Sequence, residues 1–418
     1  MGNKSFTIIV AILLGVSGVA AYAFIEEGFR TERVDYRSDE TATDYAGREV
    51  PIPTSLDGGI ITIGRLSTLR WLAYFPDEFE YVTMVDISMA AENQGALAYS
   101  YAYGDILLKA DTHSNDSLEE SEKINYANPS LILVNDATYK ACKSACDKLA
   151  MMNCLAVIDT MSDLETKGFW DKDYQLCDRF VNQADLYGTL LKNKDRAENV
   201  KTYFQDALDD IRNNCIGETS THVAYVGGPV YQGSNPLTST FNPYLPHMLV
   251  NGTNALGDDT SDKSMTPEDF GNLSFDYMFI EPSTVSPNKE GGNLLVNKPS
   301  QGVLNIVYQR NNENPNSVKL FMVMPMISHS TNWLCALTSA YHLAYLEYEI
   351  ISMDDVIEKS NDLFVKFYGE ERGNGVLEGM EIYFANLGMT VHADLCTELF
   401  SEVKVGITSN NEYILVKV

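Results

Sequence analysis

The stretch that decides the fold runs from His222 to Leu256 and reads HVAYVGGPVYQGSNPLTSTFNPYLPHMLVNGTNAL. Its apolar start, 223–226, predicts a buried strand that is broken at Gly227-Gly228-Pro229. A loop rich in hydrogen-bonding and aromatic side chains follows, and regular structure resumes at 247–250. Open α/β sheets present ligand sites on such loops, at the carboxyl ends of their strands. A long surface loop would look the same, so the rest of the chain must distinguish the two interpretations.

The residues before this stretch alternate between strand and helix patterns. Asn128-Pro129 introduces a continuous apolar run that ends at Val134, as expected for a parallel strand buried on both faces. Further strands are predicted at 59–63, 82–85 and 154–158, and a helix at 140–149. This alternation predicts a parallel-sheet α/β domain. Residues 87–105, which contain Tyr99, Tyr101 and Tyr103, are predicted to be irregular.

A long helical pattern over 178–213 separates this half from a second α/β half. It is long for one globular helix, so we expect a break near Asn193. In the second half, strands are predicted at 275–280, 303–308 and 319–324, a capped helix start at Thr266-Pro267, a surface excursion at 282–299, and helices at 333–345 and 354–368. The pattern predicts two α/β lobes joined by the long helix.

Composition and charge argue against nucleic acid as a partner. With 418 residues the chain is long enough for two domains. It has 58 acidic and 30 basic residues, a net charge of −28, which repels phosphate backbones and makes nucleic acid an unsuitable partner. Its seven cysteines have no paired metal-binding spacing and do not reveal the redox compartment.

The N-terminus carries an apolar run from Phe6 to Phe24. At about 1.5 Å per residue in a helix, this run is just long enough to cross a bilayer. Ala21-Tyr22-Ala23 also fits the small-x-small pattern of a signal-peptidase site. We therefore expect residues 1–24 to be a cleaved signal peptide or a retained membrane anchor, and both place the remainder outside the cytoplasm.

No catalytic motif is present. The sequence contains no GxSxG, P-loop, HExxH or GxGxxG pattern. His247 and His329 lie near the predicted loops, but no third ligand at a recognisable spacing completes a zinc site. What remains are loops at the ends of predicted strands, rich in Tyr, Trp, Arg, Asn and Ser, which suit binding by stacking and hydrogen bonding.

The order of segments resembles the metal-chelate solute-binding proteins of ABC importers, which bind ferric siderophores, haem or cobalamin. The matching pieces are TDYAGREVPIP (43–53), ITIGRLSTLRWLAYF (61–75), NPSLILV (128–134), VGGPVYQGSNPLTSTFNPYLPH (226–247), FDYMFI (275–280), MVMP (322–325), TNWLCALTSAYHLAY (331–345) and FVKFYGE (364–370). The resemblance covers about residues 43–368. It implies two Rossmann-like α/β lobes joined by a rigid helix, the class III periplasmic-binding-protein architecture. The ligand would lie between the lobes, and an ABC permease with its ATPase would be the partner.

On this basis we expect an extracytoplasmic, monomeric binding protein with no catalytic activity and no catalytic cofactor. Its ligand would be an iron or cobalt chelate such as a siderophore, haem or corrinoid. The expected organisation is a signal or anchor (1–24), a tether (25–45), an N-terminal lobe (46–177), a connecting helix (178–215) and a C-terminal lobe (216–418). The predicted ligand-binding residues are Arg65, Arg70, Trp71, Tyr101, Tyr103, Tyr231, Gln232, Asn235, Phe241, Tyr244, His329, Asn332 and Trp333. Arg65 and Arg70 would suit an anionic ligand, because a guanidinium matches carboxylate or catecholate oxygens.

Two other functions remain compatible with the sequence. The chain could be a cell-surface sensor or structural protein that uses the same two-lobed fold, or a metal-dependent enzyme on a nitrogenase-like fold. A trio of cysteines converging between the lobes would favour the enzyme.

Overall fold

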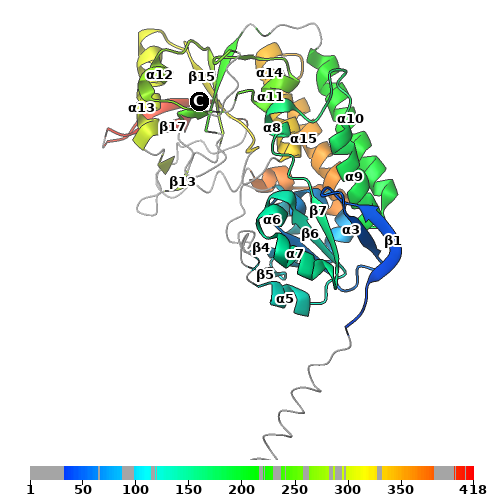
Figure 1. Cartoon of the computed structure of the whole chain (residues 1–418). Coiled ribbons are helices and arrows are strands. Elements are labelled where there is room, and N and C mark those ends of the chain that lie inside the picture. Colours follow the sequence, from blue (N-terminus) through cyan, green and yellow to red (C-terminus); the bar gives the residue numbers. More distant parts are fainter. Residues whose placement is uncertain are drawn as a thin grey trace, which may run out of the picture.

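The computed structural model describes residues 33–64, 66–86, 98–113, 118, 120–215, 220, 222–228, 237–240, 242–257, 263–281, 286–287, 294–295, 298–326, 332–380, 400, 402–409 and 411–418. Two sheets lie in separate lobes, and a group of long helices runs beside both of them (Figure 1). We call the part from β1 to α8 the N lobe. The C lobe comprises the strands from β8 (Val223–Gly227) to β17 (Tyr413–Lys417), together with the helices α11, α12 and α13. The strut comprises the long helices α9 (Asp178–Leu190), α10 (Lys194–Cys215), α14 (Trp333–Tyr348) and α15 (Met353–Tyr368).

The N lobe is built on a five-stranded parallel sheet in the order β5-β4-β3-β6-β7. Its strands are β3 (Ile60–Ile63), β4 (Val82–Asp86), β5 (Asp111–His113), β6 (Leu131–Asn135) and β7 (Cys154–Ile158). The residues of β3, β6 and β7 are buried along their whole length. Both faces are therefore covered, as their continuous apolar sequences predict.

Short helices connect these strands. They are α2 (Leu66–Leu72), α3 (Pro76–Phe79), α4 (Ala98–Leu107), α5 (Ser121–Tyr126), α6 (Asp136–Ala141), α7 (Lys143–Ala150) and α8 (Leu164–Lys167). The prediction of irregular structure up to residue 105 is wrong for the part after Ala98, because α4 buries Tyr99, Ala102, Tyr103 and Ile106 at helical spacing. The alternation of tyrosines therefore reflects a helix with one buried face.

An N-terminal hairpin is formed by β1 (Arg37–Thr43) and β2 (Glu49–Pro53), which pair antiparallel. Asp44 accepts hydrogen bonds from the backbone N–H groups of Ala46, Arg48 and Val157, so it fixes the turn and ties it to β7. Regular structure thus begins at Arg37, earlier than the predicted end of the tether.

The C lobe contains a six-stranded mixed sheet in the order β10-β8-β12-β15-β16-β17. β10 (Thr253–Asn254), β8 (Val223–Gly227), β12 (Tyr277–Ile280) and β15 (Lys319–Met322) are parallel. The hairpin of β16 (Glu402–Ile407) and β17 (Tyr413–Lys417) continues the sheet in antiparallel register. Residues 402–417 therefore complete this sheet.

The other elements of the C lobe are α11 (Leu245–Leu249), α12 (Pro267–Gly271), α13 (Lys298–Glu313), and the two-residue strands β9 (Ser239–Thr240), β11 (Lys263–Ser264), β13 (Ser286–Pro287) and β14 (Leu294–Leu295). The predicted capped start is confirmed, since Thr266 and Asp269 form a capping box at α12. The strand predicted at 303–308 is wrong, because Val303, Leu304 and Val307 form the buried face of α13.

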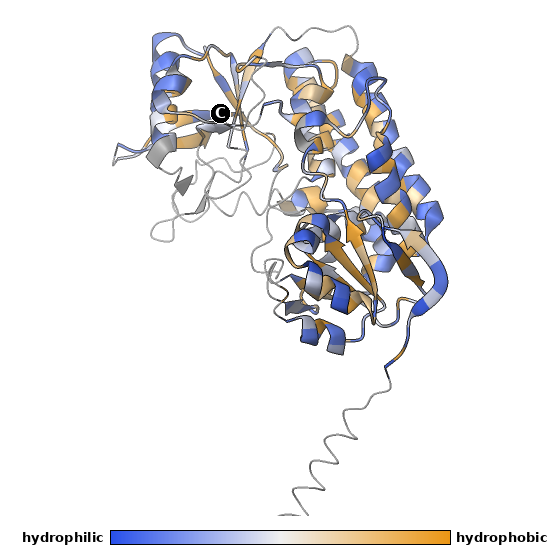
Figure 2. Ribbon diagram, in the orientation of Figure 1, coloured by the Kyte–Doolittle hydropathy of each residue, from blue (hydrophilic) through white to orange (hydrophobic). Residues whose placement is uncertain are grey.

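The strut joins the lobes through one continuous core. α9 (Asp178–Leu190) and α10 (Lys194–Cys215) are separated near Asn193, as predicted, and α10 contacts α14 (Trp333–Tyr348) and α15 (Met353–Tyr368). A single apolar cluster runs from Ile60 and Leu131 in the N lobe, through the strut, to Phe279 in the C lobe. Figure 2 shows hydrophobic strands in both sheets and hydrophilic outer faces on the strut. This shared core resists rotation of one lobe against the other.

After α15, the chain returns to the N lobe through α16 (Glu370–Gly373). Arg196 of α10 donates hydrogen bonds to the carbonyl oxygens of Lys366 and Phe367 at the end of α15. Arg372 binds Glu80 and Asp105 and lies over the ring of Tyr103. These two arginines hold the end of α15 against the N lobe.

Candidate functional site

The carboxyl ends of the strands in the two sheets meet in one region. α8, which follows β7 of the N lobe, contacts α11, which follows β8 and β9 of the C lobe. The ring of Phe169, just after α8, lies 5.2 Å from that of Trp333, the first residue of α14. Because each of these elements follows a strand of its own sheet, both sets of carboxyl ends face the same place. We call it the strand-end region.

A cluster of buried polar groups spans this region. Arg70 of α2 is 3% exposed, and Glu281, the residue after β12, is fully buried. Both charges act on the thiol of Cys335 in the first turn of α14: burial raises the pKa of Cys335, Arg70 opposes this rise, and Glu281 adds to it. A cation from the N lobe and an anion from the C lobe therefore flank one buried side chain. Buried charges of this kind require partners, because desolvation is costly.

Tyrosines surround these two charges. Burial raises the pKa of the Tyr99 hydroxyl, and the charge of Arg70 and a hydrogen bond to it oppose that rise. Burial likewise raises the pKa of Tyr244, and Glu281 raises it further. Both hydroxyls stay protonated at neutral pH, so they can donate hydrogen bonds but cannot act as bases.

The structure places four predicted site residues of the N lobe in well-packed positions. Arg70 lies in the buried cluster. Trp71 is buried, with its ring 4.9 Å from that of Phe180. Tyr103 is buried, stacks on Phe79 and donates a hydrogen bond to the carbonyl of Ala73. Tyr101 is half-buried, and its ring lies against Gly379 of the returning chain. Trp71 and Tyr103 therefore have the contacts of core residues.

Three predicted residues of the C lobe and the strut lie at the strand-end region. Tyr244, the residue before α11, and Asn332, the residue before α14, are both buried. The Asn332 side chain accepts a hydrogen bond from the N–H of Cys335 and so caps α14. Trp333 is buried against Phe169 and Phe180. These residues hold the strand-end region together from the C-lobe side.

The remaining predicted residues lie outside the described ranges. They are Arg65, Tyr231, Gln232, Asn235, Phe241 and His329. In the sequence they come after β3, β8, β9 and β15. Their roles stay predictions.

Three polar residues at the ends of apolar strands were not predicted from the sequence. Asp86 ends β4, Asn135 ends β6, and Asp159 follows β7; all three are buried. Gly64, after β3, has φ +96°, and a Cβ there would lie 2.3 Å from the Asn135 side chain, so only glycine fits. A single polar residue after each continuous apolar run is the signal that could have identified them.

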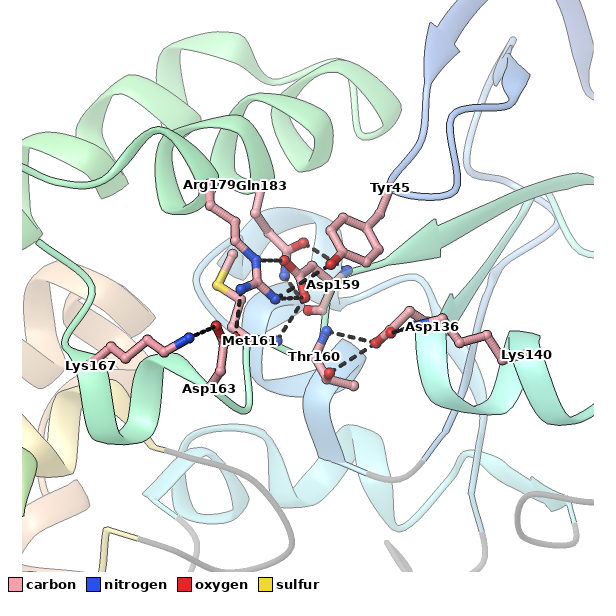
Figure 3. Close-up of polar contacts among 10 residues, drawn as sticks. All are labelled: Tyr45, Asp136, Lys140, Asp159, Thr160, Met161, Asp163, Lys167, Arg179 and Gln183. Atoms are coloured by element: carbon pink, nitrogen blue, oxygen red, sulfur yellow. Dashed lines mark hydrogen bonds and ion pairs between the residues drawn. The ribbon is translucent and has the colours of Figure 1, made fainter. Parts of the chain in front are cut away.

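Asp159 is the centre of a hydrogen-bond network that fixes the loop between β7 and α8 (Figure 3). Arg179 of α9 donates to its carboxylate, with Nη2 2.7 Å from Oδ1, and also binds Asp163 at 2.5 Å. The Gln183 amide exchanges two hydrogen bonds with the Asp159 backbone. Tyr45 and Arg179 line a groove of about 670 Å³ beside this network. The network sets the position of α8, and hence of Phe169 against Trp333.

On the C-lobe side, α11 is held by a buried pair. His247 Nε2 lies 2.6 Å from Glu347 Oε1, and both side chains are almost fully buried. Gly252 packs on this pair so closely that a Cβ would lie 2.1 Å from the His247 ring. Among the described residues there is no group of three His, Cys, Asp or Glu side chains that could hold a metal ion.

Comparisons with known proteins identify the fold. No protein-family profile and no curated protein sequence matches the chain. Among solved structures, it is similar to the TroA-like periplasmic binding protein FepB from Veillonella parvula, with a TM-score of 0.53, 13% identity, and coverage of 78% of this chain and 96% of that one.

Two further structures give the same result. The ABC transporter solute-binding protein from Sulfurospirillum deleyianum has a TM-score of 0.52, 11% identity and coverage of 79% and 96%. The molybdate periplasmic binding protein MolA of Haemophilus influenzae, bound to molybdate, has a TM-score of 0.53, 12% identity and coverage of 79% and 98%. The chain has the fold of the TroA-like periplasmic binding proteins, which confirms the predicted two-lobed α/β fold class and the resemblance seen in the sequence.

Proposed function

We propose that this chain is the extracytoplasmic solute-binding protein of an ABC importer and captures a metal chelate at the strand-end region. The observation that carries this proposal is the meeting of two sets of strand carboxyl ends, held by α8 from the N lobe and α11 from the C lobe. Open α/β sheets bind ligands at such ends. The titles of the similar solved structures name a periplasmic binding protein and an ABC transporter solute-binding protein, and MolA is bound to the metal oxyanion molybdate.

The chemistry of the region suits a chelate that offers oxygen atoms and a flat or apolar surface. The loops that follow β3, β8, β9 and β15 supply Arg65, Tyr231, Gln232, Phe241 and His329, which we propose as ligand contacts. A guanidinium binds carboxylate or catecholate oxygens, and aromatic rings stack on a planar ligand. An iron siderophore, haem or a corrinoid has both features.

The shared core implies that binding involves little movement of the lobes. Trp71 of the N lobe packs against Phe180 of the strut, and Phe180 in turn contacts Phe204 and Trp333, so the four rings form one aromatic cluster. Opening the lobes would expose this cluster to water at about 25 cal/mol for each Å² of apolar surface. We therefore propose that the ligand is recognised by a largely preformed site, which a permease then opens with the energy of ATP.

The proposed location is outside the cytoplasm, with the chain tethered to the membrane or secreted. The support is the apolar segment Phe6–Phe24 in the sequence. Within the residues that the structure describes, no helix is long and apolar enough to cross a membrane.

A thermal-shift screen tests the proposal. The purified full chain is heated with ferric catecholate and hydroxamate siderophores, haem, cobalamin, molybdate and free divalent ions. A ligand present at 100 times its Kd should add about 2.7 kcal/mol to the free energy of unfolding. If only a free divalent ion raises the Tm, the chelate proposal is wrong. If nothing raises it, the sensor or structural alternative gains support.

A substitution then tests the assigned site. Tyr231→Ala should weaken binding of the stabilising ligand about tenfold, because loss of one stacking ring costs about 0.5–1.5 kcal/mol beyond its buried area. Tyr126→Ala is the matched control, since Tyr126 is an exposed tyrosine at the opposite edge of the N-lobe sheet. Equal Kd values for wild type and Tyr231→Ala in calorimetry would show that the focal loop does not contact the ligand.

A further inference from the structure

The N lobe gathers exposed apolar side chains at the edge of its sheet opposite the strand-end region. Among its described residues and those that lead into β1, seven large apolar side chains are exposed: Val34, Tyr45, Tyr81, Leu108, Tyr126, Met151 and Met152. All except Tyr45 lie just before strands of the sheet or at the start of the described chain. We call these six residues the base patch.

The parallel topology explains why these residues share one edge. Tyr81 directly precedes β4, Leu108 precedes β5, Tyr126 precedes β6, and Met151 and Met152 precede β7. Because all five strands are parallel, the residues before them lie at the same side of the sheet, along the edge formed by the amino ends of the strands. Neighbouring strands are about 4.8 Å apart, so the edge is about 20 Å wide. Figure 1 shows α5 and the start of β1 at the end of the N lobe that is distant from the C lobe.

Hydrogen bonds hold the start of the described chain against this edge. Arg33 donates to the carbonyl of Asn125, at 3.0 Å, and to that of Met152, at 2.9 Å. Arg37 donates to the carbonyl of Met151, at 2.8 Å. Val34 lies between these two arginines in the sequence. The polypeptide therefore enters the fold through the base patch.

Because these side chains are so exposed, we expect a partner to cover them. Met151 is 72% exposed, Leu108 72% and Tyr126 68%. Single exposed apolar residues are ordinary, whereas several at one edge mark a surface that another phase or molecule covers. Tyrosine and arginine are also the residues that suit a bilayer interface, since their polar tips reach the headgroups while their bodies contact acyl chains.

The length of the preceding chain identifies the partner. Only eight residues, 25–32, separate the apolar segment ending at Phe24 from Arg33. Eight residues span at most about 28 Å even when fully extended. We propose that the base patch rests on the bilayer into which Phe6–Phe24 inserts, so that the strand-end region points away from the membrane. This inference rests on the proposed membrane tether.

Apolar contact, rather than charge, would hold the lobe to the lipid. The base carries Arg33, Arg37 and Lys123 but also Asp35 and Glu122, and the whole chain has a charge of −28. The charges named at the base nearly cancel, so their attraction to anionic headgroups is small. Contact should therefore occur on zwitterionic lipid. While it lasts, the strand-end region of the N lobe is turned toward the external solution, where solute is captured.

Radical footprinting with mass spectrometry tests this inference on native methionines. The full chain is reconstituted in phosphatidylcholine vesicles, and a protease site inserted within 25–32 releases the folded protein as a reference. Oxidation of Met151 and Met152 should be at least fivefold slower in the vesicle-bound protein than in the released protein. Met265 and Met353, which lie outside the N lobe and are partly exposed, are internal controls and should change less than twofold.

A variant with a charge in the base patch tests whether apolar contact with lipid protects Met151. Tyr126→Glu should restore rapid oxidation of Met151 on vesicles, because a carboxylate resists transfer into the interface. Ile407→Glu, an exposed apolar position of the C lobe, should leave the protection unchanged.

Three results would overturn the inference. Met151 could be equally exposed in the bound and released protein, which would mean that the patch is open. It could be equally protected in both, which would mean that a second copy of the chain covers it. The chain could also fail to remain on the vesicles, which would remove the tether. None of these results depends on which solute, if any, raises the Tm, so failure here is distinguishable from failure of the proposed function.

Discussion

The two lobes bring their strand-end elements together by different means. In the N lobe, α8 is held by a network in which Arg179, Asp159, Asp163 and Gln183 share several hydrogen bonds, part of it open to water. In the C lobe, α11 is held by one buried contact, His247 to Glu347, under Gly252. Arg179 is one-third exposed, so water can replace part of its contacts, whereas the His247–Glu347 contact is buried and has no such replacement. The C-lobe side should therefore be the more fragile.

The largest effect is expected at Gly252. In Gly252→Ala, the added Cβ would lie 2.1 Å from the His247 ring, which cannot move without breaking its 2.6 Å contact with Glu347. We expect the free energy of unfolding to fall by about 3 kcal/mol, as measured by urea titration.

Gly104→Ala is the matched control for this substitution. Gly104 lies within α4, and a Cβ there would meet no atom within 4 Å. Alanine should raise the stability by up to about 1 kcal/mol, because it is the better helix former. A loss below about 1 kcal/mol for Gly252→Ala would show that the His247–Glu347 contact is not rigid.

A smaller effect, which depends on pH, is expected at His342. This side chain of α14 is fully buried between Phe321 and Phe400, and burial lowers its pKa to about 3. The unfolded chain, with a histidine pKa of about 6.5, binds a proton that the folded chain excludes between these values. Stability therefore falls as the pH drops below 6.5, by about 2 kcal/mol at pH 5.

His342→Leu should remove this part of the pH dependence. The difference in unfolding free energy between pH 7.5 and pH 5 is measured for wild type, for His342→Leu and for Leu343→Met, a neighbouring buried control without a titratable group. The control should keep the wild-type difference. If His342→Leu keeps it too, another group is responsible for the sensitivity to acid.

The smallest effect is expected in the N-lobe network. Arg179→Ala removes the charged partner of Asp159 and Asp163 but leaves the Gln183 hydrogen bonds. Because the Arg179 side chain is one-third exposed, we expect a loss of about 1–2 kcal/mol at pH 7 in urea titrations. Lys140→Ala, which removes an exposed partner of Asp136, should cost less than about 0.5 kcal/mol.

The acid range checks the origin of the Arg179 effect. Burial raises the pKa of Asp163, but hydrogen bonds from Lys167 and Arg179 outweigh it and leave the pKa lowered. A lowered carboxyl pKa stabilises the fold above the unfolded value, about 3.9, and this contribution is lost as the pH falls through the folded value. The difference between wild type and Arg179→Ala should therefore shrink below pH 4. A constant difference down to pH 3 would contradict the ion-pair explanation.

The apolar runs of the sequence show which elements local sequence can predict and which it cannot. The runs at 131–135 and 154–158 are strands because only a doubly buried strand is continuously apolar over that length, and both strands are present. The strand predicted at 303–308 from a similar apolar run is wrong, because Val303, Leu304 and Val307 form the inner face of α13. A short apolar run has the same composition in a strand and in a helix. The apolar cluster that α13 shares with Tyr225 of β8 and Met278 of β12 selects the helix, because helical spacing turns all three side chains toward the sheet.

The candidate site was predictable only in part. The glycine break after β8 and the aromatic loops of the sequence follow the carboxyl ends of predicted strands, which can be read from chain direction, and the proposed site lies at such ends. Trp71 and Tyr103 were expected to contact ligand, yet they pack against Phe180 and Phe79. An aromatic residue looks the same in the sequence whether its ring contacts a ligand or packs in the core. Which role it takes depends on the residues that the fold packs against it.

The sequence by itself determined the alternation of strands and helices, the two-lobed fold class, the break in the strut near Asn193 and the acidic charge, because these depend on local periodicity and composition. Only the tertiary structure decided which strand ends meet, which arginines are buried, and that the chain after α15 returns to cover α4. These outcomes depend on contacts between residues distant in sequence, such as Arg372 with Asp105 and His247 with Glu347. No local pattern encodes such pairs, because the two partners are far apart in the sequence and only the folded chain brings them within contact distance.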